Sequence, residues 1–203
     1  STHSNGILLR NGFDVHSFYF INRICPRMFV DQTRSLQVID TRFATPKEMQ
    51  VKCFEAHLSL ASEIELPLFM HEREASKLQI DILKNRRKDF SKGVIHCFTG
   101  DRQTLYQYLD MDLHIGITGW ICDPRRGMPL QDLVADIPLD RLMIETDSPY
   151  LLPRNLAFPP KDGRNEPSFL PWVVSGIAAC REESKEEIAE QTGKTAIKFF
   201  GLE

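Results

Sequence analysis

Two histidines and one aspartate occupy equivalent points of the chain, because each ends a short apolar run. His71 ends the first run, His96 the second and Asp147 the fourth. One histidine in such a place is more often a hydrogen-bonded structural residue, but three ligand-type side chains at three equivalent positions favour a metal site. Imidazole nitrogens suit Zn²⁺ or Mn²⁺, and added carboxylates and waters admit Mg²⁺. We therefore expect His71, His96 and Asp147 to be metal ligands and catalytic residues.

The elements that must position these residues alternate regularly from residue 45 onward. The apolar runs are 67–71, 93–96, 113–118 and 142–147, and helical patterns cover about 45–65, 74–88, 102–110, the stretch through 130–137 and the stretch from 184. Strands that are apolar throughout and alternate with amphipathic helices are typical of parallel βαβ units. The carboxyl ends of such strands share one face, where α/β folds build their sites. A weaker strand candidate lies at 36–39.

The two outer helices carry start signals. A capping box at Thr45–Glu48 precedes the first helix, which should end near Glu65 because Pro67 disfavours helical backbone at the residue before it. A second capping box at Ser184–Glu187 opens the last helix. The first helix shows one apolar stripe at steps of three and four residues, formed by Met49, Cys53, Ala56, Leu60 and Ile64.

Composition narrows the class of protein. The 203 residues carry a formal net charge of −3, and 42% of them are hydrophobic, which indicates one globular domain, or one with an appendage. This charge argues against a broad basic face that grips long nucleic acid, but it allows a local site for a strand end. No apolar run approaches the ~18 residues of a membrane helix, so no membrane partner is expected. The five widely spaced cysteines include no CxxC pair, which favours reduced thiols and an intracellular location, cytoplasmic or nuclear.

Other chemistries lack their sequence signatures. There is no Gly-x-Ser-x-Gly element, no P-loop and no Gly-x-Gly-x-x-Gly. Cys97 follows His96 directly, and adjacent strand residues face opposite sides, so a Cys/His nucleophilic pair is disfavoured. The same alternation predicts that only one of Glu145 and Asp147 points into the site.

Several motifs carry a resemblance to a known family. In chain order they are PLFMHERE (67–74), VIHCFTGD (94–101), IGITGWICDPRRG (115–127), LMIETDSPYLLPR (142–154), RNEP (164–167) and GKTAIKFFGL (193–202). They resemble the TatD family of metal-dependent deoxyribonucleases. The resemblance implies a TIM-barrel metallohydrolase that holds one or two divalent ions and cuts DNA from its three-prime end. It also implies roles in DNA repair or DNA fragmentation.

The resemblance also implies residue roles. His71, His96 and Asp147 match the family's metal-ligand positions, and Arg73 matches the Arg of its HxR motif. The substrate-binding or phosphate-binding candidates are Arg73, Arg164, Asn165 and Glu166. Arg164 suits a phosphate because its planar guanidinium matches phosphate oxygens. An ion pair of Arg164 with Glu166 or Asp162 is the equally weighted alternative.

The chain departs from the family before residue 45. Family members have about three more strands there and a Glu that bridges two metals. This chain has Leu36 at the corresponding place and no Glu in 1–47. We therefore expect a divergent segment 1–44, a family-like barrel portion 45–203, an incomplete barrel, one well-held ion and doubtful binding of a second.

Two other interpretations are compatible with the sequence. The chain could be a catalytically impaired isoform that acts only by binding, or a metallohydrolase of another substrate, since this barrel hosts many chemistries. An open barrel edge predicts a homodimer unless residues 1–44 cover it.

Overall fold

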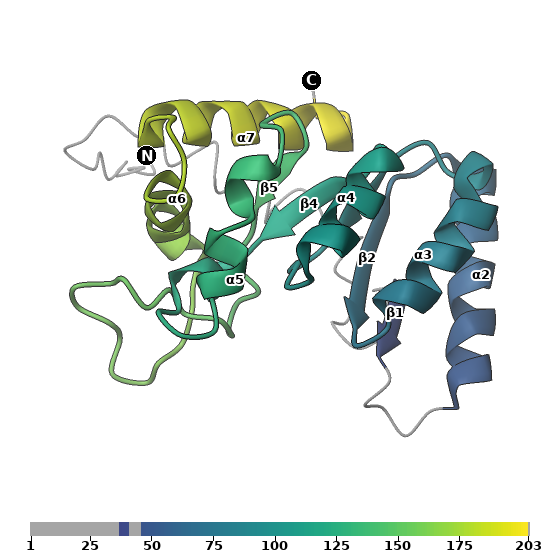
Figure 1. Cartoon of the computed structure of the whole chain (residues 1–203), viewed down its shortest axis with the longest axis horizontal. Coiled ribbons are helices and arrows are strands. Elements are labelled where there is room, and N and C mark those ends of the chain that lie inside the picture. Colours follow the sequence, from purple (N-terminus) through teal and green to yellow (C-terminus); the bar gives the residue numbers. More distant parts are fainter. Residues whose placement is uncertain (1–36, 41–45, 203) are drawn as a thin grey trace, which may run out of the picture.

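The structure is a computed structural model that describes residues 37–40 and 46–202 (Figure 1). Its sheet contains five strands: β1 (Gln37–Asp40), β2 (Leu68–Arg73), β3 (Gly93–Ile95), β4 (His114–Ile117) and β5 (Leu142–Ile144). The α-helices are α2 (Lys47–Ile64), α3 (Ser76–Asn85), α4 (Arg102–Asp110), α5 (Met128–Gln131), α6 (Leu170–Ala178) and α7 (Lys185–Phe200). Short 3₁₀ turns are η1 (Arg87–Asp89), η2 (Gly119–Cys122), η3 (Val134–Asp136) and η4 (Pro167–Phe169).

The strands are all parallel and lie side by side in chain order. This arrangement confirms the predicted βαβ units, and β1 confirms the weak candidate at 36–39. Among the described residues β1 pairs only with β2 and β5 only with β4, so these strands form an open sheet. Figure 1 shows α2 and α3 beside β1 and β2, and α6 and α7 at the end of the sheet that carries β5. Leu36 and most of the segment 1–44 lie outside the described residues, so the domain boundary stays a prediction.

Helix α2 buries a different face from the predicted one. The side chains that it buries are Gln50, Phe54, Leu58 and Ala61. Three members of the predicted stripe are instead about half exposed: Met49 (57%), Leu60 (49%) and Ile64 (51%). The prediction was wrong because α2 carries two apolar stripes, and the one with Phe54 and Leu58 packs on the sheet. The helix ends as predicted, with Glu65 in the left-handed region at φ 55°, whereas the capping residue Thr45 lies outside the described residues.

Later helices differ from expectation in two places. The predicted helix through 130–137 is divided into α5 and η3, although Leu130, Leu133, Val134 and Ile137 are all buried. Helix α6 was not predicted, and Pro171 stands in its first turn, where a missing N–H costs nothing. The start of α7 was predicted correctly, since the Ser184 hydroxyl accepts from the N–H of Glu187 at 3.1 Å.

Two other histidines, His114 and His57, make local contacts within the fold. His114 begins β4, and its ring packs against that of Phe199 with 4.8 Å between centroids. Burial, aided by the charge of Arg141, lowers the pKa of His114 to about 4, so this ring stays neutral at pH 7. His57 lies in α2, where its ring bonds the carbonyl of Cys53. None of the described helices is both long enough and apolar enough to cross a membrane.

Candidate metal centre

The carboxyl ends of the strands bring the predicted ligands to one place. His71 lies in β2, His96 directly follows β3, and Asp147 comes three residues after β5. The rings of His71 and His96 lie 5.6 Å apart between centroids. The Nε2 atom of His96 lies 3.3 Å from Oδ1 of Asp147. The three side chains thus share one edge of the sheet, as their positions in the sequence indicated.

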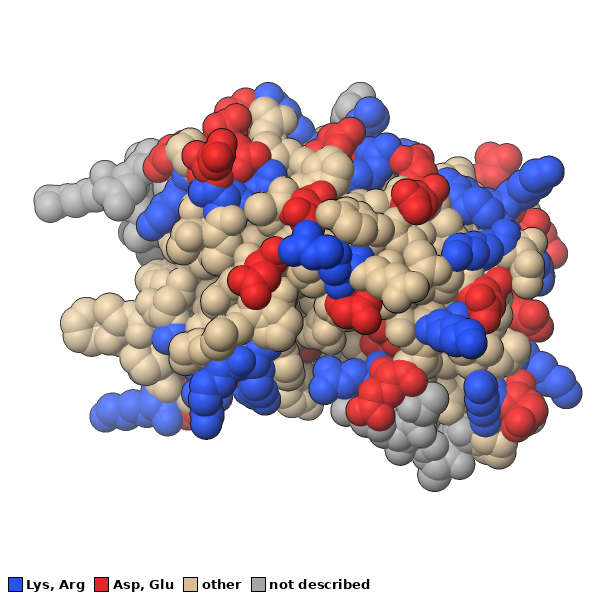
Figure 2. All heavy atoms as spheres, in the orientation of Figure 1, with Lys and Arg blue, Asp and Glu red and all other residues tan. Residues whose placement is uncertain are grey.

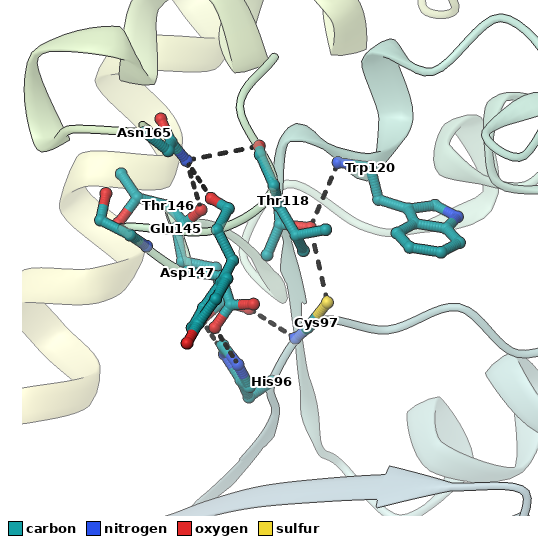
Figure 3. Close-up of polar contacts among 11 residues, drawn as sticks. His96, Cys97, Thr118, Trp120, Glu145, Thr146, Asp147 and Asn165 are labelled. Atoms are coloured by element: carbon teal, nitrogen blue, oxygen red, sulfur yellow. Dashed lines mark hydrogen bonds and ion pairs between the residues drawn. The ribbon is translucent and has the colours of Figure 1, made fainter. Parts of the chain in front are cut away.

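His96 is held between two carboxylates (Figure 3). Its Nδ1 lies 2.7 Å from Oε2 of Glu145, while its Nε2 faces Asp147. The prediction that only one of the two carboxylates points into the site was therefore wrong. Strand β5 ends at Ile144, and Asp147 has a left-handed backbone at φ 58°. Strict strand alternation no longer applies beyond Ile144, so both side chains can reach the same imidazole.

Glu145 is fixed by contacts from two neighbouring strands. Its Oε1 accepts the backbone N–H of Cys97 at 2.5 Å. On the β4 side, Gly116 leaves the room that the carboxylate fills, since a Cβ there would lie 2.5 Å from Oε1. Any larger residue at Gly116 would push Glu145 away from His96.

The charges of this cluster set the state of His96 in the metal-free molecule. Burial by itself would lower the pKa of His96, but the negative charge of Glu145 and the ring's hydrogen bonds to Asp147 and Glu145 raise it to about 10. The imidazole is therefore protonated at pH 7, with its Nε2–H directed at Asp147. A cation bound by Nε2 and Asp147 would take the place of this proton.

Cys97 does not act as a nucleophile here. Burial raises the pKa of its thiol to about 12, so the thiolate is scarce at neutral pH. Its sulfur lies 3.5 Å from the hydroxyl oxygen of Thr118 (Figure 3).

The donor set fits a divalent ion in its chemistry. Two imidazoles and a carboxylate match Zn²⁺ or Mn²⁺, and ligand histidines are commonly oriented by a carboxylate on the other ring nitrogen, as Glu145 does for His96. Within residues 37–40 and 46–202, no three His, Cys, Asp or Glu side chains lie close enough together to hold a metal ion as they stand. Binding of an ion by His71, His96 and Asp147 therefore requires these side chains to close around it.

The RNEP segment positions the loop after β5. Asn165 is only 2% exposed, and its amide N–H groups donate to the carbonyls of Thr146, Tyr150 and Leu151. These bonds use the side chain of Asn165 for holding the loop, so the predicted phosphate contact is not supported for this residue. Glu166 is exposed and accepts from the Ser168 hydroxyl at 3.3 Å.

The two candidate arginines differ in their surroundings. Arg164 is exposed, and its backbone N–H donates to Asp162 at 3.1 Å. In the described part of the chain its guanidinium makes no ion pair, so the alternative of a pair with Glu166 or Asp162 is not realised. Arg73, at the end of β2, places its guanidinium 5.7 Å from the centre of the Trp120 ring.

Comparison with known proteins identifies the family. Residues 39–201 match the family described as TatD related DNase. A "3'-5' ssDNA/RNA exonuclease TatD" of Rahnella sp. is 49% identical over 158 residues, and one of Erwinia amylovora is 49% identical over 160 residues. The chain belongs to the TatD family.

The aligned region is most of this chain but not of its relatives. The alignment with the Rahnella protein covers 78% of this TatD chain and 60% of that protein. The alignment with the Erwinia protein covers 79% of this chain and 61% of that protein. The chain thus spans about three fifths of the length of these curated relatives.

Solved structures confirm the predicted TIM-barrel fold. A TatD homologue from Escherichia coli K12 superposes with a TM-score of 0.73 at 23% identity, covering 93% of this chain and 70% of that one. A TatD-family hydrolase from Entamoeba histolytica superposes with a TM-score of 0.68 at 24% identity, covering 77% of this chain and 58% of that one. The five-stranded sheet is therefore a portion of the TatD barrel.

Glu145 is the site residue that sequence reasoning left out. It was set apart from Asp147 by the assumption of strand alternation. One usable signal was Gly116 in the neighbouring strand β4, because a residue without a side chain in a buried strand often marks a close approach by another group.

Gly116→Ala tests the packing around Glu145. The added methyl group should displace the carboxylate and break its hydrogen bond to His96, without unfolding the TatD chain. In the metal-free parent, proton NMR should show a ring N–H of His96 far downfield and slow to exchange. We expect this signal to be lost or shifted upfield in Gly116→Ala.

The matched control is Gly193→Ala, since a Cβ at Gly193 meets nothing within 4 Å. An unchanged His96 signal in Gly116→Ala, with circular dichroism like that of the parent, would contradict the proposed packing.

Proposed function

We propose that this chain is a metal-dependent nuclease that hydrolyses phosphodiester bonds of single-stranded DNA from the three-prime end. The observation that carries the proposal is the carboxylate–His96–carboxylate cluster at the strand ends, with His71 beside it. The relatives from Rahnella and Erwinia are named as 3'-5' exonucleases of single-stranded DNA and RNA, which supports this substrate class.

In this proposal His71, His96 and Asp147 hold the ion. A divalent ion bound there would polarise the phosphodiester as a Lewis acid and lower the pKa of the attacking water. Glu145 keeps the His96 ring in position through Nδ1, so that Nε2 faces the ion. Asp147, 33% exposed, can also accept a proton from water at the open side of the cluster.

The roles of the surrounding residues follow from their contacts. Asn165 holds the loop that carries Asp147, and Arg73 and Arg164 supply positive charge for substrate phosphates. Glu166 stays a candidate at the rim. We propose one well-held ion, because Leu36 stands where the family's bridging Glu is expected and two ions ~3.5–4 Å apart need such a bridge.

A second candidate function is that of a catalytically impaired chain that acts only by binding. The lack of a Glu in residues 1–47, where the family carries its bridging Glu, favours it. An intracellular location, the choice among Mg²⁺, Mn²⁺ and Zn²⁺, and roles in DNA repair or fragmentation stay predictions.

Digestion of a five-prime-labelled single-stranded oligonucleotide separates these functions. With Mn²⁺ or Mg²⁺ we expect a ladder of successively shorter labelled products, and EDTA should abolish it. Asp147→Asn and His71→Ala should each lower the rate about 100-fold or more, since both change a metal ligand. The parent itself should be about 10–100-fold slower than the Rahnella relative, because one bridging carboxylate is missing.

His57→Gln in α2 is the control, and it should match the parent. A rate that survives EDTA or both ligand substitutions would contradict the proposed function. No digestion by the folded parent under any metal would instead support the impaired isoform.

We further propose that the chain forms a homodimer through the β1 edge. Among the described residues β1 has one strand neighbour, which leaves a side of its backbone for pairing. Ser59 contacts Arg86 on one flank of α2, whereas exposed Met49, Leu60 and Ile64 lie on the other flank. Exposed apolar side chains next to a strand edge that no described strand pairs with are suited to self-association.

Light scattering coupled to size-exclusion chromatography tests the dimer. The parent should elute at twice the monomer mass, and Leu60→Glu should shift it to the monomer because a charge cannot be buried unpaired. Lys52→Glu, also exposed on α2, is the charge control and should stay dimeric. A parent that stays monomeric at high concentration would refute this proposal.

A further inference from the structure

A cavity of about 510 Å³ lies between η2 and the loop after β5. One wall begins at Gly119, directly after Thr118, and the other begins at Pro149, two residues after Asp147. The two walls touch, because a Cβ at Gly119 would lie 2.1 Å from the carbonyl oxygen of Leu151. The cavity is therefore bounded by the segment that follows Thr118 and by the same loop that follows Asp147.

Two aromatic side chains line this cavity. Trp120 comes from η2, and Tyr150, which is 65% exposed, comes from the loop after β5. The indole N–H of Trp120 donates to the carbonyl of Arg126 at 3.1 Å, which fixes the orientation of the ring. In Figure 3 the indole ring points away from the His96 cluster, with Thr118 between them.

A buried carboxylate holds two arginines at the rim of the cavity. Asp123 is 4% exposed, and its Oδ2 accepts from Nε and Nη2 of Arg126 at 3.1 and 3.0 Å. The Nε atom of Arg154 lies 3.4 Å from the same oxygen. Hydrogen bonds from the backbone N–H groups of Arg126 and Arg125 hold the pKa of Asp123 well below its usual range, so it stays anionic.

The two guanidiniums keep part of their surface for a ligand. The side chains of Arg126 and Arg154 are 56% and 60% exposed. The guanidinium of Arg126 lies 4.6 Å from the centre of the Trp120 ring, and that of Arg73 lies 5.7 Å from it. Figure 2 shows Lys and Arg side chains gathered at the lower left of the molecule, where Figure 1 places the loop after β5.

Aromatic faces combined with fixed cations are the chemistry that binds single-stranded nucleic acid. Bases stack on aromatic rings whatever their sequence, and arginines contact the backbone phosphates. A duplex cannot use such a cavity, because its bases are already stacked and paired. The cavity walls offer aromatic faces and guanidiniums, which favours binding without strong sequence preference.

We propose that this cavity binds the nucleotide next to the scissile end of single-stranded DNA. Its base stacks on the exposed ring of Tyr150, and its phosphate contacts Arg154 and Arg126, whose guanidinium lies over Trp120. The inference rests on the proposed nuclease function for the direction of the strand. The cavity would keep the strand single and lead its end to His71, His96 and Asp147.

Binding of a four-nucleotide oligothymidylate in EDTA tests this inference without hydrolysis. Fluorescence titration should show that Tyr150→Ala raises the Kd about tenfold, as expected for the loss of one stacked base. Arg154→Gln should lower the slope of log Kd against the logarithm of the salt concentration by about the amount expected for the loss of one phosphate contact. Binding of thymidine monophosphate should be unaffected by either change, since one nucleotide does not reach the cavity.

Phe158→Ala is the matched control, because Phe158 is in the same loop and 93% exposed but does not line the cavity. It should leave the Kd within about twofold of the parent. If Tyr150→Ala and a folded Trp120→Leu both bind like the parent, the inference is overturned.

The outcomes of this test and of the digestion assay can be told apart. A chain that binds the oligonucleotide through the cavity but never hydrolyses it would keep this inference and refute the nuclease proposal. A chain that digests DNA at the same rate and KM with Tyr150→Ala as with the parent would refute the inference alone.

Discussion

The imidazole of His96 lies between Glu145 and Asp147, and the arrangement of the site depends on this contact. Two negative charges around one buried ring would repel each other without a cation between them. In the metal-free molecule that cation is the protonated ring itself, whose pKa is about 10. A divalent ion at Nε2 would serve the same electrostatic purpose. The cluster is therefore built for a positive charge in either state.

The rest of the fold supports this contact from several directions. Gly116 in β4 makes room for Glu145, and the backbone N–H of Cys97 donates to it. Cys97 and Asp147 both have left-handed backbone, at φ 50° and 58°. Such conformations cost energy in residues other than glycine and are concentrated at functional sites. Asn165 stabilises the loop after β5 with three carbonyl contacts, so the geometry of Asp147 depends on a residue 18 positions further along the chain.

Sequence reasoning predicted the parts of this site that depend on strand ends. His71, His96 and Asp147 were expected to lie together, because parallel strands of apolar residues place their carboxyl ends on one edge, and the structure brings them there. The prediction from sequence failed where two local patterns are equally apolar and only tertiary packing decides which one is buried. The pattern of α2 contains two apolar stripes, and only the sheet determines that Phe54 and Leu58 are buried while Leu60 is exposed. Glu145 was missed for a related reason: period-two alternation holds only while the chain stays in a strand, and β5 ends at Ile144. The buried role of Asn165 depends on contacts with a distant loop, which no local pattern reveals.

In the metal-bound molecule we expect His71, His96 and Asp147 to close around one divalent ion. Crystals of the chain soaked in Mn²⁺ and measured at a wavelength with strong manganese anomalous scattering test it directly. We predict one strong anomalous peak within about 2.0–2.4 Å of a nitrogen of His71, Nε2 of His96 and an oxygen of Asp147, with Glu145 still bonded to Nδ1 of His96. A strong peak elsewhere, or an ordered site with His96 still bonded to Asp147 and no peak between them, would contradict this metal site.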